Sequence, residues 1–270
     1  MVEIINKKKT TLQAINELQG DSNLRPYLGM SQLGHSCERF LWYSFRWCYS
    51  DDVSARMFRL FNRGHREEPA IISLLNRVGI HIYDEQGEVV AVHGHVKGHY
   101  EGILSGVIEA PKTPHLAEFK TMNDKAFKDI TKQGVKLSKP QHYAQMQMYM
   151  RKIPLTRALY VAVNKNDDSL YIERVYADDT VANSLFERAE SIVLSEEPPE
   201  KRYKKTWYEC KWCSASGICH NGKEVESNCR TCISCDLMPI GKWECSLHEI
   251  PLTTSQQRVG CKKYSKLENL

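Results

Sequence analysis

The chain has 270 residues, of which 41% are hydrophobic and 26% are charged, a composition that supports one sizeable core and excludes an intrinsically disordered chain. No apolar run approaches the ~18 residues that a membrane span needs, and no signal-peptide core follows the charges at the start. We therefore expect a cytoplasmic protein with no membrane partner. Charge is uneven, because residues 201–270 hold 12 Lys and Arg against 7 Asp and Glu, whereas the net charge of the whole chain is only +4.

The first two thirds of the chain alternate between helical and strand patterns. Apolar residues at three- and four-residue steps predict a helix over 53–78, which Pro69 should kink or restart. Short β-like segments follow at 81–83, 89–93, 99–108 and 115–121, and the turn-rich stretch 109–114 predicts a hairpin from the last two. A helix over 140–152 begins with proline, a second hairpin joins 157–163 to 170–176, and a capped helix covers 179–194. These elements indicate an α/β fold with a mixed central sheet flanked by helices.

Two acidic residues are expected to meet in the first hairpin. Side chains alternate along a strand, so Glu118 and Lys120 share one face while Phe119 points to the other. An antiparallel neighbour can bring Glu101 beside Glu118. Two carboxylates at one place need a cation between them, and Mg²⁺ or Mn²⁺ prefers such oxygen ligands. With Lys120 holding the attacking water, this group predicts hydrolysis of phosphodiesters.

Flanking helices carry further polar residues in a fixed order. The long helix presents His65 and Glu68, and the later helix presents Gln145 and Tyr149, which are four residues apart and so share one face. The order of helix acid, strand acid, Glu-x-Lys and Gln-x-x-x-Tyr is more specific than any one of these motifs.

On these motifs, residues 30–220 resemble the PD-(D/E)XK nuclease superfamily, in particular its RecB-like and lambda-exonuclease-like (YqaJ-type) branches, which phages often encode. The resemblance implies a restriction-endonuclease-like core. It also implies a divalent ion held by Glu68, Glu101, Glu118 and the Phe119 carbonyl, with Lys120 beside it. His65 is a second candidate for the helix ligand. Usually the first acid is Asp, and here Glu101 stands in its place.

The same resemblance implies a function and partners. Gln145 and Tyr149 would contact DNA near the cleaved phosphate. The expected activity is that of a Mg²⁺- or Mn²⁺-dependent DNA exonuclease, which processes single-stranded or end-bearing duplex DNA in recombination or replication, with a recombination or replication protein as a possible partner. The alternative is a catalytically weak or inactive nucleic-acid-binding or assembly protein that keeps the nuclease fold.

Ten cysteines in an intracellular protein point to metal rather than to disulfides. Cys210, Cys213 and Cys219 form a C-x2-C-x5-C pattern that converges on one centre. Iron-sulfur members of the superfamily pair this pattern with an early cysteine, which implies Cys37 as the fourth ligand of a [4Fe-4S] cluster, with four-coordinate zinc as the alternative. Around this cluster, Trp207, Tyr208 and Trp212 are expected either to stack on bases or to pack against it.

A second group of cysteines lies near the end of the chain. The C-x2-C pair Cys229 and Cys232, followed by Cys245 and Cys261, has a zinc-ribbon-like layout, with Cys235 and His248 as alternate ligands. This short segment has few large aliphatic residues and would need a metal to stay folded. We therefore expect a nuclease core over 1–205, a cysteine element over 206–222 that closes with Cys37, and a zinc-binding module over 223–270.

Overall fold

The computed structural model describes residues 9–17, 25–50 and 53–270, and its main feature is a five-stranded mixed sheet with the strand order β2-β5-β6-β7-β8. The central pair, β6 and β7, is parallel, and the other neighbours are antiparallel. The strands are β2 (His81–Tyr83), β5 (Ile103–Ser105), β6 (His115–Met122), β7 (Arg157–Asn164) and β8 (Leu170–Tyr176).

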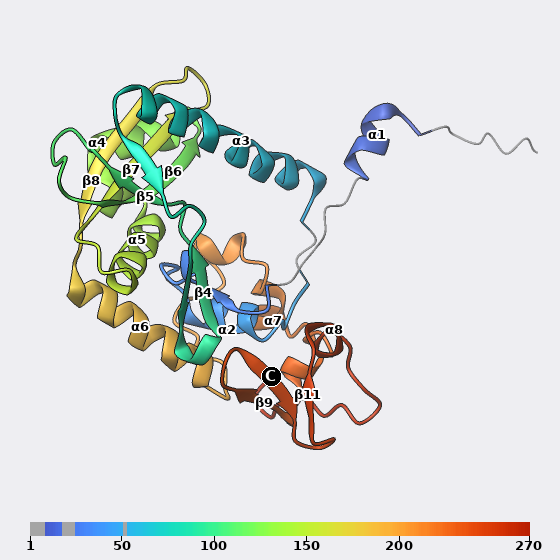
Figure 1. Ribbon diagram of the computed structural model, residues 1–270. Helices are drawn as coiled ribbons and strands as arrows, with labels where there is room; N and C mark the ends of the chain where they lie inside the picture. Colours follow the sequence, from blue (N-terminus) through green and yellow to red (C-terminus); the bar gives the residue numbers. More distant parts are fainter. Residues whose placement is uncertain (1–8, 18–24, 51–52) are drawn as a thin grey trace, which may run out of the picture.

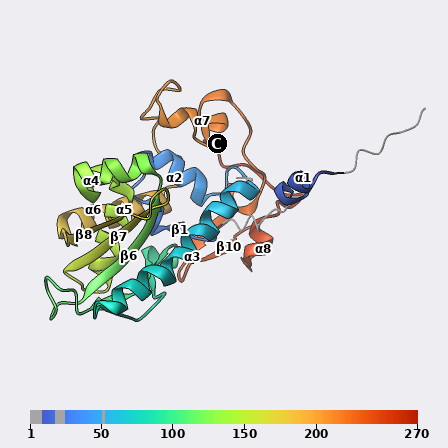
Figure 2. The same ribbon diagram turned by 90° about the horizontal axis from the view of Figure 1, so that it is seen from above.

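Helices cover both faces of this sheet, as the expected fold class requires (Figure 1, Figure 2). On one face, Ile71 and Leu75 of α3 (Ala55–Arg77) pack with Phe119 in one apolar cluster. On the other face, Met146 of α5 packs in a second cluster with Tyr160. The helices on that side are α4 (Asp124–Ser138), α5 (Pro140–Lys152) and α6 (Asp179–Leu194). Alternation along β6 and β7 therefore decides which side chains face α3 and which face α5.

Most of the expected elements are present, with some corrections. The helices at 140–152 and 179–194 and the strand at 170–176 have the predicted bounds. Helix α3 is not divided at Pro69. The expected strand over 99–108 is wrong, because this range holds the last residue of β4 (Val96–His99), a loop with Glu101, and the whole of the short β5. Helix α4 was not predicted, and its Gly134 has a positive φ of 74° that interrupts the helical pattern.

A smaller sheet and several short helices connect the core to the rest of the chain. Its order is β1-β4-β3, with β1 parallel and β3 antiparallel to β4. The elements before and within it are α1 (Thr11–Asn16), β1 (Leu28–Gly29), η1 (Met30–Gln32), α2 (Glu38–Phe45), β3 (Glu88–Ala91) and η2 (Val92–Gly94). The expected strand at 89–93 therefore ends early, at Ala91, where η2 begins.

The C-terminal part contains an antiparallel sheet of order β11-β10-β9. Its elements are η3 (Glu209–Lys211), α7 (Ser216–Asn221), η4 (Cys229–Thr231), β9 (Cys235–Met238), β10 (Lys242–Cys245), β11 (Ile250–Leu252) and α8 (Thr254–Gln257). Trp243 of β10 lies in the same buried cluster as Leu28 and Trp42. Residues 223–270 thus share a core with the N-terminal segment. Within the described ranges, no helix is both long and apolar enough to cross a membrane.

Candidate active site

Strand β6 brings three oxygen groups around one ammonium group. The Nζ of Lys120 lies 2.5 Å from Oε1 of Glu118 and 3.4 Å from Oε1 of Glu101. It also donates to the Phe119 carbonyl at 3.0 Å. Three of the four groups that the sequence assigned to a metal therefore surround a single positive charge.

Glu101 reaches this point from the loop between β4 and β5. Its carboxylate accepts a hydrogen bond from the backbone N–H of Phe119, which ties the loop to β6. Burial raises the pKa of Glu101 to about 8, against the lowering effect of Lys120, and the negative charges of Glu118 and Glu68 raise it further. A metal-free site therefore holds a proton on Glu101 at neutral pH.

Glu118 is fully buried on the α5 side of the sheet. Burial raises its pKa above the ordinary value, although Lys120 lowers it. Burial also opposes the charge of Lys120, but the nearby Glu118 and Glu101 outweigh that effect and raise the pKa of the lysine. Oε1 of Glu118 has the Lys120 ammonium as its partner, so this oxygen already faces a cation.

The fourth predicted ligand, Glu68, stands on α3 across a cleft of about 450 Å³. Glu101, Phe119 and Lys120 line the same cleft. Glu68 lies 3.3 Å from Nδ1 of the exposed His65, its neighbour on the helix. Three of the four predicted ligands thus line this cleft, whereas Glu118 is fully buried and contacts Lys120.

Gln145 and Tyr149 are placed differently from the predicted contact with DNA. Both are buried on α5. Nε2 of Gln145 donates to Oε2 of Glu118 and to the hydroxyl of Tyr149, both at 3.4 Å. Burial raises the pKa of Tyr149, so the hydroxyl stays protonated. In this structure Gln145 donates to the Glu118 carboxylate, and neither Gln145 nor Tyr149 lines the cleft.

Two basic residues of the cleft were missed by sequence reasoning. Arg25 and Lys165 line it together with Lys120. Lys165 follows β7, and its backbone N–H donates to the Met122 carbonyl at the end of β6. Lys165 could have been found from the sequence, because it follows a predicted strand, and the carboxyl ends of adjacent parallel strands meet at one edge of a sheet. These cations suit phosphate groups on either side of a scissile bond.

A second missed pair lies beneath Lys120. Nδ1 of His142 and the hydroxyl of Tyr160 are 2.7 Å apart. Burial, followed by the positive charge of Lys120, lowers the pKa of His142 to about 3. A neutral imidazole here adds no charge to the site and leaves Lys120 as its cation.

The donor set fits a hard divalent ion. It consists of carboxylates and a carbonyl, and Oε1 of Glu118 already faces a positive charge, the ammonium of Lys120. Within the described ranges, no three His, Cys, Asp or Glu side chains are already gathered closely enough to hold a metal ion. At the carboxylate site the ammonium of Lys120 lies between the acids, and ligation would require it to move aside.

The predicted cysteine ligands also come together in two places. Cys37, Cys210, Cys213 and Cys219 line one small cavity of about 20 Å³. Burial raises the pKa of the Cys213 thiol, and the neighbouring thiols Cys37, Cys210 and Cys219 raise it further. A cavity of this size has room for about one water. A single metal ion would need the thiols to draw closer together, whereas a four-iron cluster would need the cavity walls to separate.

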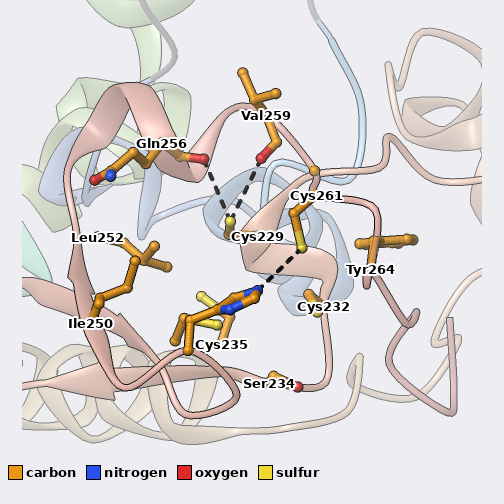
Figure 3. A pocket seen from close by; sticks show the side chains of 13 residues that line it. Cys229, Cys232, Ser234, Cys235, Ile250, Leu252, Gln256, Val259, Cys261 and Tyr264 are labelled. Carbon is orange, nitrogen blue, oxygen red and sulfur yellow. Dashed lines mark hydrogen bonds between the residues drawn. The ribbon is translucent and has the colours of Figure 1, made fainter.

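The second cavity, of about 260 Å³, lies between the C-terminal sheet and α8. Figure 3 shows Cys229, Cys232, Cys235 and Cys261 around it, and Sγ of Cys261 lies 3.8 Å from Nε2 of His248. The candidate ligands on its walls are Cys229, Cys232, Cys235, Cys245, His248 and Cys261. The four ligands predicted for zinc and the two alternates thus line the same cavity.

Two buried arginines lie next to this second cavity. Arg46 and Arg230 are buried, and no carboxylate of the described chain comes within ion-pair distance of either guanidinium. Burial lowers the pKa of both arginines, and the negative charge of a Cys235 thiolate would oppose that lowering. A metal centre with several thiolates carries net negative charge, so it would compensate two cations that otherwise lack a counter-charge.

Comparisons with known proteins give only distant likenesses. No protein-family model matches the chain, and no curated protein does. The crystal structure of SSO0001 aligns over 73% of this chain and 87% of its own, with 17% identity and a TM-score of 0.45. An alkaline exonuclease (LHK-Exo) from Laribacter hongkongensis aligns over 62% of this chain and 86% of its own, with 17% identity and a TM-score of 0.47. Its complex with dAMP aligns over 64% and 88%, with 14% identity and a TM-score of 0.45. At such values the likeness supports no conclusion about chemistry.

Proposed function

We propose that this chain is a divalent-metal-dependent deoxyribonuclease, an exonuclease that hydrolyses phosphodiesters at DNA ends. One observation carries the proposal: Glu101, Glu118 and the Phe119 carbonyl surround Lys120 beside an open cleft. Burying two carboxylates is costly unless a cation compensates them. A structural role alone does not explain why this group opens into a cleft with Arg25 and Lys165.

Each residue has a defined task in the proposed reaction. Glu68, Glu101, Glu118 and the Phe119 carbonyl would hold Mg²⁺ or Mn²⁺, which when bound stabilises negative charge that develops on the phosphate. Lys120 orients the attacking water through its N–H donors. Arg25 and Lys165 contact phosphates along the cleft, and Gln145 fixes the Glu118 carboxylate.

A cleavage assay tests the proposal. Labelled single-stranded and duplex DNA are incubated with the protein and Mg²⁺ or Mn²⁺, in linear and covalently closed circular forms. An exonuclease shortens the linear substrates progressively and leaves the circles intact, whereas cut circles would indicate an endonuclease. If every substrate stays intact while the protein binds it, the alternative of a non-catalytic nucleic-acid-binding protein is correct.

We expect thermal stabilisation by Mn²⁺ to increase between pH 6 and pH 8. The folded metal-free protein keeps Glu101 protonated up to about pH 8, whereas the unfolded chain loses this proton near pH 4.5. The metal-free fold therefore loses stability as pH rises through this range. Mn²⁺ must displace the proton, so its affinity should rise by up to about tenfold per pH unit. Melting temperatures with and without Mn²⁺ measure the difference, and Glu101→Gln should abolish its pH dependence. An equal Mn²⁺ effect at both pH values would contradict the assignment of Glu101 as a ligand.

We propose two further metal centres in the cysteine cavities. Cys37, Cys210, Cys213 and Cys219 would hold a [4Fe-4S] cluster, as the resemblance implies, or a zinc ion, which the small cavity favours. Cys229, Cys232, Cys245 and Cys261 would hold zinc, with Cys235 and His248 as alternates. The first centre would fasten distant parts of the chain together, and the second would stabilise the C-terminal segment.

Metal analysis distinguishes these cases. Anaerobically purified protein should be brown, absorb near ~400 nm and contain roughly four irons if the cluster is present, or be colourless with two zincs. Cys232→Ser should remove one zinc and lower the melting temperature, while leaving iron unchanged. Cys48→Ala is the matched control, because Cys48 is buried outside both cavities and burial raises its pKa to about 12. A wild-type protein without zinc would refute the second centre.

A further inference from the structure

An exposed aromatic and basic surface lies beside the first cysteine cavity. Residues 201–212 contain five basic residues against one acidic residue, Glu209. They also contain the aromatic residues Tyr203, Trp207, Tyr208 and Trp212. We refer to residues 201–212 as the aromatic-basic segment.

The aromatic rings of this segment are not used for packing in the core. Trp212 is 89% exposed, Tyr208 is 62% exposed and Trp207 is 41% exposed. Tyr203 and Trp207 stack at a centroid distance of 5.2 Å with an interplanar angle of 10°. Tyr208 lies 5.0 Å from Trp207. Of the two roles expected from the sequence, packing against the cysteine cluster is therefore excluded for Trp212.

Both ends of the segment are anchored. Before it, Arg39 donates to the Pro199 carbonyl at 2.6 Å. At the other end, Ser36 donates to the Glu209 carboxylate. Cys210 and Cys213, which flank Trp212, line the first cysteine cavity. The aromatic rings are thus held out on a fixed loop, which lowers the entropy cost of binding to them.

The basic side chains lack internal partners. Lys201, Arg202, Lys204, Lys205 and Lys211 take part in no ion pair with the described residues, and four of them lie within five positions of one another. Unpaired cations attract a polyanion, and flat exposed rings offer faces for stacking. In a duplex the bases are already stacked on one another, so only a single strand can use both features.

Residues 25–36 contact both the cleft and the aromatic-basic segment. Arg25 lines the cleft, and Ser36 contacts the aromatic-basic segment through Glu209. Between them, Gly34 packs against Gln141 and Ala144 of α5, the helix that carries Gln145. A short stretch of chain therefore connects both places.

From these observations we propose that the aromatic-basic segment binds single-stranded DNA, with bases stacked on Trp212 and on the Tyr203–Trp207–Tyr208 group and phosphates on the lysines. The choice of DNA rests on the proposed nuclease function; the preference for a single strand does not. The strand bound here would be the one that the cleft cleaves or its displaced complement.

Binding assays without added divalent ions test this proposal independently of cleavage. With the full-length protein and labelled oligothymidylate, Trp212→Ala should weaken binding by about tenfold, and Trp212→Phe by much less. Affinity for blunt duplex should change less than twofold. Tyr208→Ala should also weaken single-strand binding. Tyr176→Ala is its matched control, because Tyr176 is 55% exposed on β8, and it should have no effect.

Salt dependence tests the charges separately. Replacing Lys204 and Lys205 with alanine should reduce the slope of log affinity against log salt by about 1.4, or ~0.7 per phosphate contact. The matched control replaces Lys125 and Lys132, which are exposed on α4. Intrinsic fluorescence gives a third readout, because Trp42, Trp47 and Trp243 are buried and quenching by oligothymidylate would come from Trp207 and Trp212.

Several outcomes overturn the proposal. The proposal is wrong if Trp212→Ala and Tyr208→Ala bind single-stranded DNA as tightly as the wild type. It is also wrong if these variants lose as much affinity for duplex DNA as for single-stranded DNA. A change in the association state of Trp212→Ala without loss of DNA affinity would assign the surface to a second copy of the chain. If wild-type protein cleaves no DNA but its single-strand binding depends on Trp212, the inference stands and the nuclease function fails.

Discussion

Lys120→Ala should lower the rate of DNA cleavage by about 10²–10³-fold, the usual loss when one hydrogen-bond donor at the reacting centre is removed. Lys120 is the cation around which Glu101, Glu118 and the Phe119 carbonyl gather. Its removal deprives the attacking water of its donor at the scissile phosphate. DNA binding should change less than twofold, because Arg25 and Lys165 still line the cleft. Cleavage under single-turnover conditions and fluorescence anisotropy measure the two effects.

The control must separate lost chemistry from lost folding. Without Lys120 the buried Glu118 loses its counter-charge in the metal-free protein, so the melting temperature should fall and then recover in Mn²⁺. Lys120→Met keeps the length of the side chain and should be equally inactive. Lys165→Ala is the matched control, because it removes another cation from the cleft and should mainly weaken DNA binding. Equal losses of binding and cleavage in Lys120→Ala would indicate misfolding and would leave the proposed role of Lys120 without support.

Sequence reasoning predicted the local parts of this site well. Alternation on β6 correctly separated Phe119 from Glu118 and Lys120, because the period of a strand is a local property. The helix over 140–152 was found because its proline start is also a local signal. Glu101 was predicted beside Glu118, but its bond to the Phe119 N–H depends on a loop that interrupts the predicted strand.

Non-local packing decided what the sequence could not show. Nothing in the Gln-x-x-x-Tyr spacing tells which side of α5 faces the sheet, and the sheet buries Gln145 and Tyr149 behind Glu118. Arg25 lines the cleft although it lies far from β6 in the sequence, and the indole N–H of Trp47 donates to its carbonyl. Likewise, residues 223–270 were expected as a separate small module, but Arg230 connects them to Pro26 and Phe45, far away in the sequence.

Arg230→Met should lower the free energy of unfolding by about 3 kcal/mol, as expected for buried partners left without a charged donor. The guanidinium donates to the carbonyls of Phe45 and Pro26 at 2.9 and 2.8 Å and to Oε1 of Gln257 at 2.9 Å. It also lies 3.7 Å from the centroid of the Trp47 ring. Burial lowers the pKa of Arg230 to about 9, so the charge is costly but present at neutral pH. Because burying this charge costs free energy, the expected decrease in the free energy of unfolding is smaller than the summed contributions of the three hydrogen bonds.

Arg46→Met is the matched control, because Arg46 is buried beside Arg230 but bonded more weakly. Its two hydrogen bonds are both 3.4 Å long, and its buried Nε has no hydrogen-bond partner among the described residues. Its loss should therefore cost less than half as much as that of Arg230. Urea denaturation measures both, and hydrogen exchange should show the largest loss of protection in residues 25–47 for Arg230→Met. An equal cost for the two variants would mean that side-chain volume, and not these hydrogen bonds, joins the C-terminal sheet to the N-terminal segment.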